Sequence, residues 1–111
     1  MGKPNSLDDL QNVQAKFDQE YLTYPNHYRP DDKIRNINLH LGKLVGKVST
    51  YSEAVEHGRA ADDSVLKTEV MPDLLFYALQ LANIYDVDLE KVYLQRLEDD
   101  KRRIGNERRQ D

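Results

Sequence analysis

The chain contains no cysteine, no long hydrophobic run and no excess of basic charge. The lack of cysteine excludes disulfides, thiolate metal sites and a cysteine nucleophile. No apolar segment approaches the roughly 20 residues that cross a bilayer. The first ten residues, MGKPNSLDDL, carry no apolar segment of a secretory signal. We therefore expect a cytoplasmic protein that does not enter membranes.

The composition predicts one small folded domain. Hydrophobic residues make up 39% and charged residues 32% of the 111 residues, a balance typical of a helical globular protein. The net charge of −4 argues against a nucleic-acid binder. We expect a single domain over 1–111, with an ordered core at about 6–104 and a tail at 105–111. The end of the chain, KRRIGNERRQD, is locally basic, and this charge suits a helix C-terminus.

Apolar periodicity predicts four helices and no strand. They are expected at about 6–21, 30–57, 68–85 and 89–103. Ser6, Thr68 and Asp88 are predicted N-caps, and Gly58 and Gly105 are predicted helix ends. The connections are mostly short, so the fold class predicted is all-α, as an antiparallel four-helix bundle.

The second helix carries an apolar stripe and two glycines. The stripe comprises Ile34, Ile37, Leu41, Leu44, Val48, Tyr51 and Val55. Gly42 and Gly46 lie on a different side of the helix, and each costs about 1 kcal/mol relative to alanine. Two such residues four apart indicate close approach of another backbone, either from a tightly crossed helix or from another subunit.

Few residues support catalysis directly. The serines and the three histidines lack the arrangement of a nucleophilic or histidine–metal site. Glu69 and Asp73 share a helix face beside the apolar run LLFYALQLA, so they need a metal, a cation or hydrogen-bond donors unless they are exposed acids of a first helical turn. In the loop after the first helix, Tyr24 and Tyr28 either stack on a base or attach the loop to the core.

The segment DLLFYALQLANIYDVDLEKVYLQRLEDDKRR resembles the C-terminal half of MazG-like all-α nucleoside triphosphate pyrophosphohydrolases. The phrase VDLEKV at 87–92 and the dipeptide VG at 45–46 carry the resemblance, which spans about 7–103. It implies a four-helix fold completed by self-association into a dimer or tetramer. It also implies the family reaction, in which a nucleoside triphosphate gives a monophosphate and pyrophosphate through Mg²⁺ held by clustered carboxylates.

The sequence departs from the family at the acidic motif. The glutamates that the family keeps on its long helix fall on KLVGK, where Lys43 and Leu44 replace a glutamate pair and Lys47 replaces a third acid. Of the following E-x-x-D motif only Asp73 matches, and Glu69 is displaced by one residue. Ammonium groups at Mg²⁺-ligand positions repel the metal.

We expect Lys43 and Lys47 to pair with Glu69 and Asp73 across the helices, or, together with His40, to bind phosphate. The predicted protein therefore has no metal and no cofactor, and needs Mg²⁺ only if it is active. It acts as a nucleotide-binding or phosphate-binding module or as an interaction module, without normal Mg²⁺-dependent hydrolysis.

Two alternatives stay open. An active pyrophosphohydrolase would use a nonstandard carboxylate set, for which Glu53 and Glu56 form a further E-x-x-E on the second helix. The helix would have to roll for these acids to meet Asp73. Alternatively, the chain is an unrelated helical adaptor protein.

Overall fold

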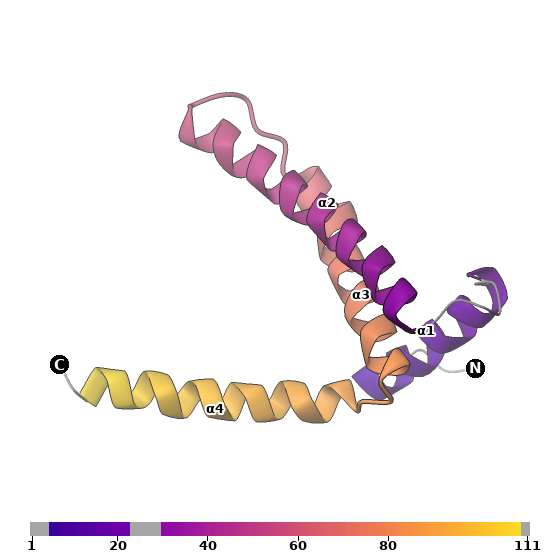
Figure 1. Ribbon diagram of the computed structural model, residues 1–111. Helices are drawn as coiled ribbons and strands as arrows, with labels where there is room; N and C mark the ends of the chain where they lie inside the picture. The colour runs from indigo at the N-terminus through magenta and orange to yellow at the C-terminus, as the bar shows by residue number, and fades with distance from the viewer. Residues whose placement is uncertain (1–4, 23–29, 110–111) are drawn as a thin grey trace.

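The computed structural model describes residues 5–22 and 30–109, and most of these residues lie in helices, with no strand among them (Figure 1). The elements are α1 (Leu7–Tyr21), α2 (Pro30–Glu56), the π-helical turn η1 (Leu66–Val70), α3 (Met71–Ile84) and α4 (Leu89–Arg109). The prediction of an all-α protein with four helices packed together is confirmed. No helix among the described residues is long and apolar enough to cross a membrane.

Local caps explain most of the helix boundaries. The Ser6 hydroxyl accepts a hydrogen bond from the Asp9 amide at 3.1 Å, and the Asp88 carboxylate accepts one from the Lys91 amide at 3.2 Å. Both predicted N-caps are thus confirmed. Helix α2 ends at a Schellman motif, in which Gly58 has a φ of +66° and the Arg59 amide donates to the Ala54 carbonyl at 2.8 Å.

The predicted N-cap at Thr68 is wrong. Thr68 lies inside η1, and its hydroxyl donates to the Ser64 carbonyl at 2.7 Å. The reason is Pro72, in the first turn of α3, which has no amide hydrogen to donate to the preceding turn. One π-helical turn, with the Met71 amide bonded to the Leu66 carbonyl, lets the chain continue into α3 without a break.

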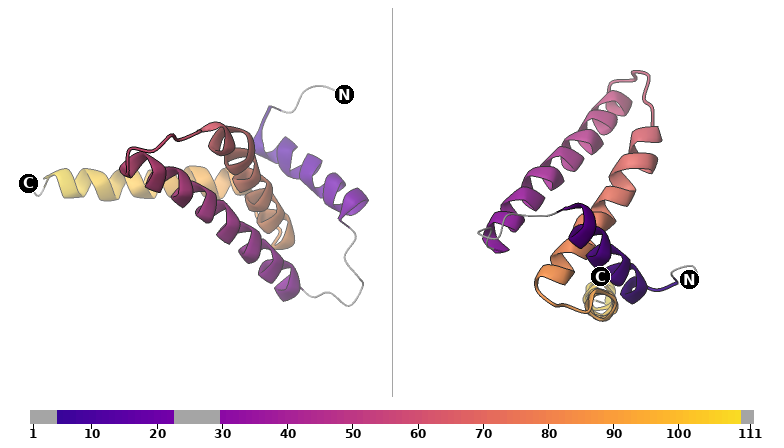
Figure 2. Two further views of the ribbon diagram at one scale, coloured as in Figure 1. Left: turned by 90° about the horizontal axis from the view of Figure 1, so that it is seen from above. Right: turned by 90° about the vertical axis from the view of Figure 1, so that its right-hand side faces the viewer.

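Helices α2 and α3 run antiparallel and side by side, while α1 packs against the C-terminal half of α3 (Figures 1 and 2). The rings of Phe17 and Phe76 meet edge to face with centroids 5.8 Å apart. The buried hydrophobic side chains lie along these contacts. They are Ile37, Leu44, Val70, Leu79 and Ala82.

Helix α4 starts at a junction of hydrogen bonds around Gln11. The Gln11 side chain donates to the Val87 carbonyl at 2.9 Å and accepts from the Leu89 amide at 3.0 Å. The Asn83 side chain donates to the Gln11 carbonyl at 3.0 Å. These bonds fix the start of α4 against α1 and α3, and α4 then projects away from the α2–α3 hairpin (Figure 1).

The predicted helix end at Gly105 is wrong, because α4 continues through it to Arg109. Ion pairs three and four residues apart, such as Arg102–Asp99 at 2.8 Å, stabilise the helix before the glycine. A single glycine costs only about 1 kcal/mol, so it ends a helix only where the chain must turn.

The two glycines of α2 do not approach another helix within the chain. A Cβ atom added at Gly42 or Gly46 would meet nothing within 4 Å in the described structure. The expectation of a tightly crossed helix from the same chain is therefore wrong, and the alternative, a contact with another subunit, stays a prediction.

Candidate functional site

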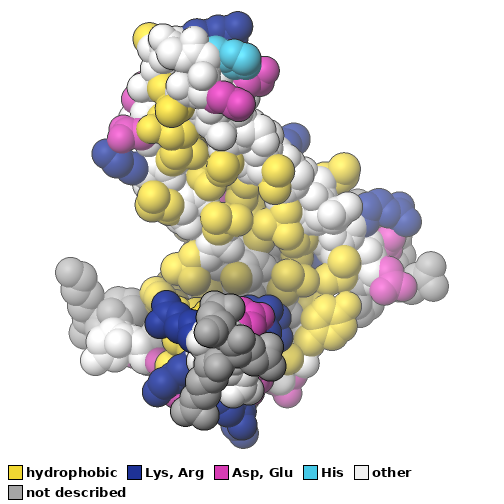
Figure 3. All heavy atoms as spheres, turned by 90° about the vertical axis from the view of Figure 1, so that its left-hand side faces the viewer, with side chains coloured by type: hydrophobic (Ala, Val, Ile, Leu, Met, Phe, Trp, Pro, Cys, Tyr) yellow, Lys and Arg dark blue, Asp and Glu magenta, His cyan; other side chains and the backbone are white. Residues whose placement is uncertain are grey.

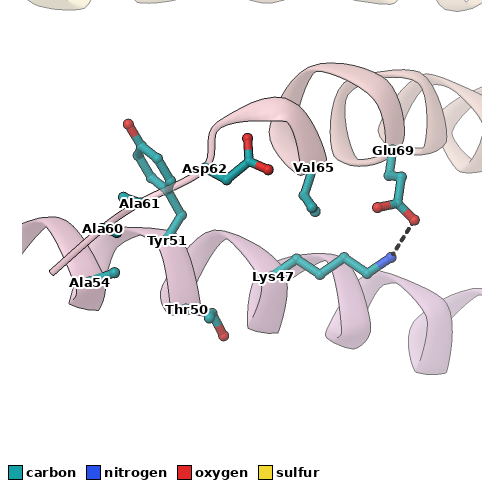
Figure 4. A pocket seen from close by; sticks show the side chains of 9 residues that line it. All are labelled: Lys47, Thr50, Tyr51, Ala54, Ala60, Ala61, Asp62, Val65 and Glu69. Atoms are coloured by element: carbon teal, nitrogen blue, oxygen red, sulfur yellow. Dashed lines mark hydrogen bonds and ion pairs between the residues drawn. The ribbon is translucent and has the colours of Figure 1, made fainter.

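The site that the sequence points to lies where α2 faces η1. Lys47 Nζ lies 3.4 Å from Glu69 Oε1, and the two side chains are 40% and 50% exposed (Figure 4). An ammonium this close to a carboxylate neutralises its charge. Because the pair is largely solvated, it contributes little to stability, roughly 0–1 kcal/mol.

The Lys47–Glu69 pair closes one end of a cavity of about 410 Å³ (Figure 4). The side chains around it come from α2, η1 and the segment that joins them. They are Lys47, Thr50, Tyr51, Ala54, Ala60, Ala61, Asp62, Val65 and Glu69. The walls are mostly apolar, and one ammonium with two carboxylates gives the cavity a formal charge of one negative.

Asp62 is held in place by the start of the following turn. The Ser64 amide donates to Asp62 Oδ1 at 2.9 Å. This backbone hydrogen bond lowers the pKa of Asp62 from 3.8, with further contributions from the Ser64 hydroxyl and the nearby Lys67 charge. Asp62 is therefore ionised at neutral pH, and it keeps a negative charge at the cavity mouth.

The other predicted site residues are not gathered around this pair. Lys43 is exposed, and it makes no ion pair with a described residue. His40 stacks on Tyr77, with ring centroids 5.3 Å apart and 10° between the planes. Asp73 is half-buried and likewise has no ion-pair partner among the described residues. Tyr24 and Tyr28 lie outside the described residues.

No group of three or more histidine, cysteine, aspartate or glutamate side chains in the described ranges 5–22 and 30–109 is placed to hold a metal ion. Glu53 and Glu56, the alternative acids, are both exposed on the last turns of α2. From the predicted set, the structure brings together Lys47 and Glu69, and in the described part of the chain it forms no metal-binding group of three carboxylates.

Several cavity residues were missed in the sequence. Thr50 and Ala54 are small residues one helical turn apart, and Ala60 to Asp62 follow the end of α2. A small-residue edge on α2 beside a segment rich in small residues is the signal that could have indicated this cavity. Periodicity of the apolar residues carries no such information, because the cavity depends on how that segment folds back.

Comparison with known proteins yields no match to any family model, any curated protein or any solved structure.

Proposed function

We propose that this chain is a helical interaction module related to MazG-like pyrophosphohydrolases, without their normal Mg²⁺-dependent hydrolysis. The observation that carries the proposal is the Lys47–Glu69 ion pair, at 3.4 Å, where the resemblance implies acidic metal ligands. The resemblance itself rests on sequence phrases and on the four-helix architecture.

The charge of the site supports the loss of metal chemistry. Mg²⁺ needs several oxygen ligands in near-octahedral geometry. The Lys47 ammonium takes up the Glu69 charge and repels a divalent cation from the same space. Asp73, the one acid that matches the family motif, belongs to no group of three or more acids or histidines placed to hold a metal among the described residues.

The charge of the cavity favours an interaction role over nucleotide binding. A triphosphate carries several negative charges, whereas Asp62 and Glu69 leave the cavity with a net negative charge. Lysine alone binds phosphate as a point charge, and here it is paired with a carboxylate. Nucleotide binding is the second candidate, favoured only by the size of the cavity and by the Tyr51 ring in its wall.

The test is pyrophosphate release from each common nucleoside triphosphate with Mg²⁺ or Mn²⁺, together with calorimetric titration of both metals. We expect no release above the protein-free blank and no saturable metal binding. Metal-dependent release that is abolished by Glu69→Gln or Asp73→Asn, but not by the control Glu98→Gln on the exposed face of α4, would contradict the proposal.

A parallel titration with nucleotides separates the two binding roles. We expect no saturable heat with mono-, di- or triphosphates. Saturable binding lost in Lys47→Met and retained in Lys43→Met would replace the interaction module by the nucleotide-binding candidate.

A further inference from the structure

Exposed hydrophobic side chains of α2 and α3 form a band on one side of the molecule (Figure 3). Apolar contact has no direction, so this band by itself selects no class of ligand. The cavity of about 410 Å³ between α2 and η1 is different, because apolar walls there meet charged groups at fixed positions. An apolar pocket with a few placed polar groups is the usual form of a ligand site.

The floor of the cavity is apolar and partly shielded from water. Tyr51 and Ala54 of α2 and Val65 at the start of the next helix are half-buried, and all three line the cavity (Figure 4). Ala60 and Ala61 form part of the exposed rim. The small side chains leave the floor open to an apolar body of a few carbon atoms, whose transfer from water is favourable.

The carboxylates of the cavity lie at its exposed rim. Glu69 is paired with Lys47 at 3.4 Å, and this pairing neutralises its charge. Asp62 makes no ion pair with a described residue, whereas the nearby Lys67 binds Asp63 at 3.1 Å. The negative charge that the rim offers to a ligand is therefore that of Asp62.

The order of these groups sets how a ligand lies in the cavity. An ammonium stays at the rim, where Asp62 attracts it and water still reaches it, and an apolar body enters toward Ala54 and Val65. The Tyr51 ring lies in the wall near Asp62 (Figure 4), and the face of an aromatic ring attracts cations. A lysine or arginine side chain carries its charge at its far end, so it would bring the charge to the apolar floor first, where desolvation opposes it.

We propose that the cavity binds an organic monocation whose ammonium group is attached to a small apolar body, with the ammonium at Asp62 and the body over Ala54 and Val65. The inference names the ligand class of the interaction module proposed above, and it rests on that function. Two sources offer this chemistry. One is a free hydrophobic amine, and the other is the amino-terminal residue of a partner chain that begins with an apolar side chain.

The first test titrates the full chain with 2-phenylethylamine and follows the backbone amide signals by NMR. We expect saturable shifts with a dissociation constant of about 1 mM or lower, centred on residues 47–69. 2-Phenylethanol has the same apolar body without the charge, and we expect it to bind about three- to fivefold more weakly, the effect of one solvated ion pair. 3-Phenylpropionate carries the opposite charge and is expected not to saturate the protein.

Two neighbouring acids give a matched pair of variants. Asp62→Asn keeps an oxygen that can accept the Ser64 amide and removes the charge at the rim. We expect it to weaken amine binding about three- to fivefold and to leave binding of the alcohol unchanged. Asp63→Asn removes the same charge one residue away, outside the cavity lining, and is expected to change amine binding by less than about twofold, because solvent screens the charge.

A filling variant tests the apolar floor without a change of charge. Ala54→Leu places a larger side chain in the space for the apolar body, and we expect it to weaken binding of both the amine and the alcohol by about tenfold or more. Ala15→Leu, the same substitution at an exposed position of α1, is the control and is expected to bind both like wild type.

A further titration separates the two sources of the ammonium. The probe is phenylalanylglycine amide, compared with its N-acetylated form, which has no charge. Tighter binding of the free peptide than of 2-phenylethylamine would assign the site to the end of a partner chain, and weaker binding would assign it to a free amine. No saturable shift with the amine, equal affinity for the amine and the alcohol, or equal effects of Asp62→Asn and Asp63→Asn would each overturn the proposal.

These outcomes are distinct from failure of the proposed function. Amine binding by a protein that also releases pyrophosphate would sink the function and keep the site. An inactive protein that binds no amine would sink the site and keep the loss of hydrolysis.

Discussion

The two sides of α2 differ in kind. Toward α3 and η1, α2 contributes a salt bridge from Lys47, a stacked ring from His40 and the buried side chains of Ile37 and Leu44. On its outward side, α2 exposes valines and bare glycine backbone. The side toward α3 therefore removes apolar area from water and stabilises the fold, whereas the outward valines contribute little to the stability of a single chain.

Substitutions at two neighbouring residues test the difference between the two sides of α2 most strongly. Leu44 is 3% exposed and Val45 is 64% exposed. We expect Leu44→Ala to lower the free energy of unfolding by about 2–4 kcal/mol, because it leaves a cavity. Val45→Ala is expected to change the free energy of unfolding by less than about 0.5 kcal/mol, because its side chain is exposed. Urea unfolding of the two variants measures both effects, and equal losses would contradict the assignment of sides.

A substitution in the junction at the start of α4 is expected to have the next largest effect on stability. Gln11→Ala removes the acceptor of the Leu89 amide and the donor to the Val87 carbonyl. We expect the free energy of unfolding to fall by about 1–3 kcal/mol, because partly buried backbone groups lose their partners. Faster hydrogen exchange at the Leu89 amide is the direct measurement, and Gln19→Ala on the exposed side of α1 is the control. Unchanged exchange would show that α4 is held by other contacts.

Alanine at Gly46 tests whether this position of α2 is open. Since nothing lies within 4 Å of an added Cβ, Gly46→Ala is expected to raise the free energy of unfolding by about 0.5–1 kcal/mol. Urea unfolding of the variant beside wild type measures the effect. A loss of stability would mean that another group covers the position.

The smallest expected effect on stability comes from removing the Lys47–Glu69 salt bridge. Because Lys47 and Glu69 are about half exposed, a double-mutant cycle with Lys47→Met and Glu69→Gln is expected to give a coupling of under about 1 kcal/mol. The coupling should shrink in high salt, since ions screen exposed charges. Lys43→Met serves as the uncoupled control. A coupling well above this value, insensitive to salt, would mean that the pair is desolvated, for instance by a partner chain.

Local signals in the sequence were sufficient to predict that the chain forms four helices and to place several of their ends. Ser6, Asp88 and Gly58 marked helix ends because each makes its cap with residues a few positions away. The predicted helix end at Gly105 was wrong, because a glycine ends a helix only where the chain must turn. Nothing in the sequence around Gly105 shows that the chain continues straight there.

Contacts between residues far apart in the chain could not be predicted from the sequence. The apolar stripe of α2 is about 100° wide, and periodicity cannot tell which edge of it meets α3 and which stays outward. The Gln11–Asn83 bonds join residues 72 positions apart, and amide side chains follow no periodic pattern. The approach of Lys47 to Glu69 was accessible only through the resemblance, because it depends on how two helices pack.

Pyrophosphate release from nucleoside triphosphates in the presence of Mg²⁺ or Mn²⁺ tests the account most directly. If the Lys47 ammonium pairs with Glu69 in place of a metal, release stays at the level of the protein-free blank. Metal-dependent release that is lost in Glu69→Gln would contradict the account.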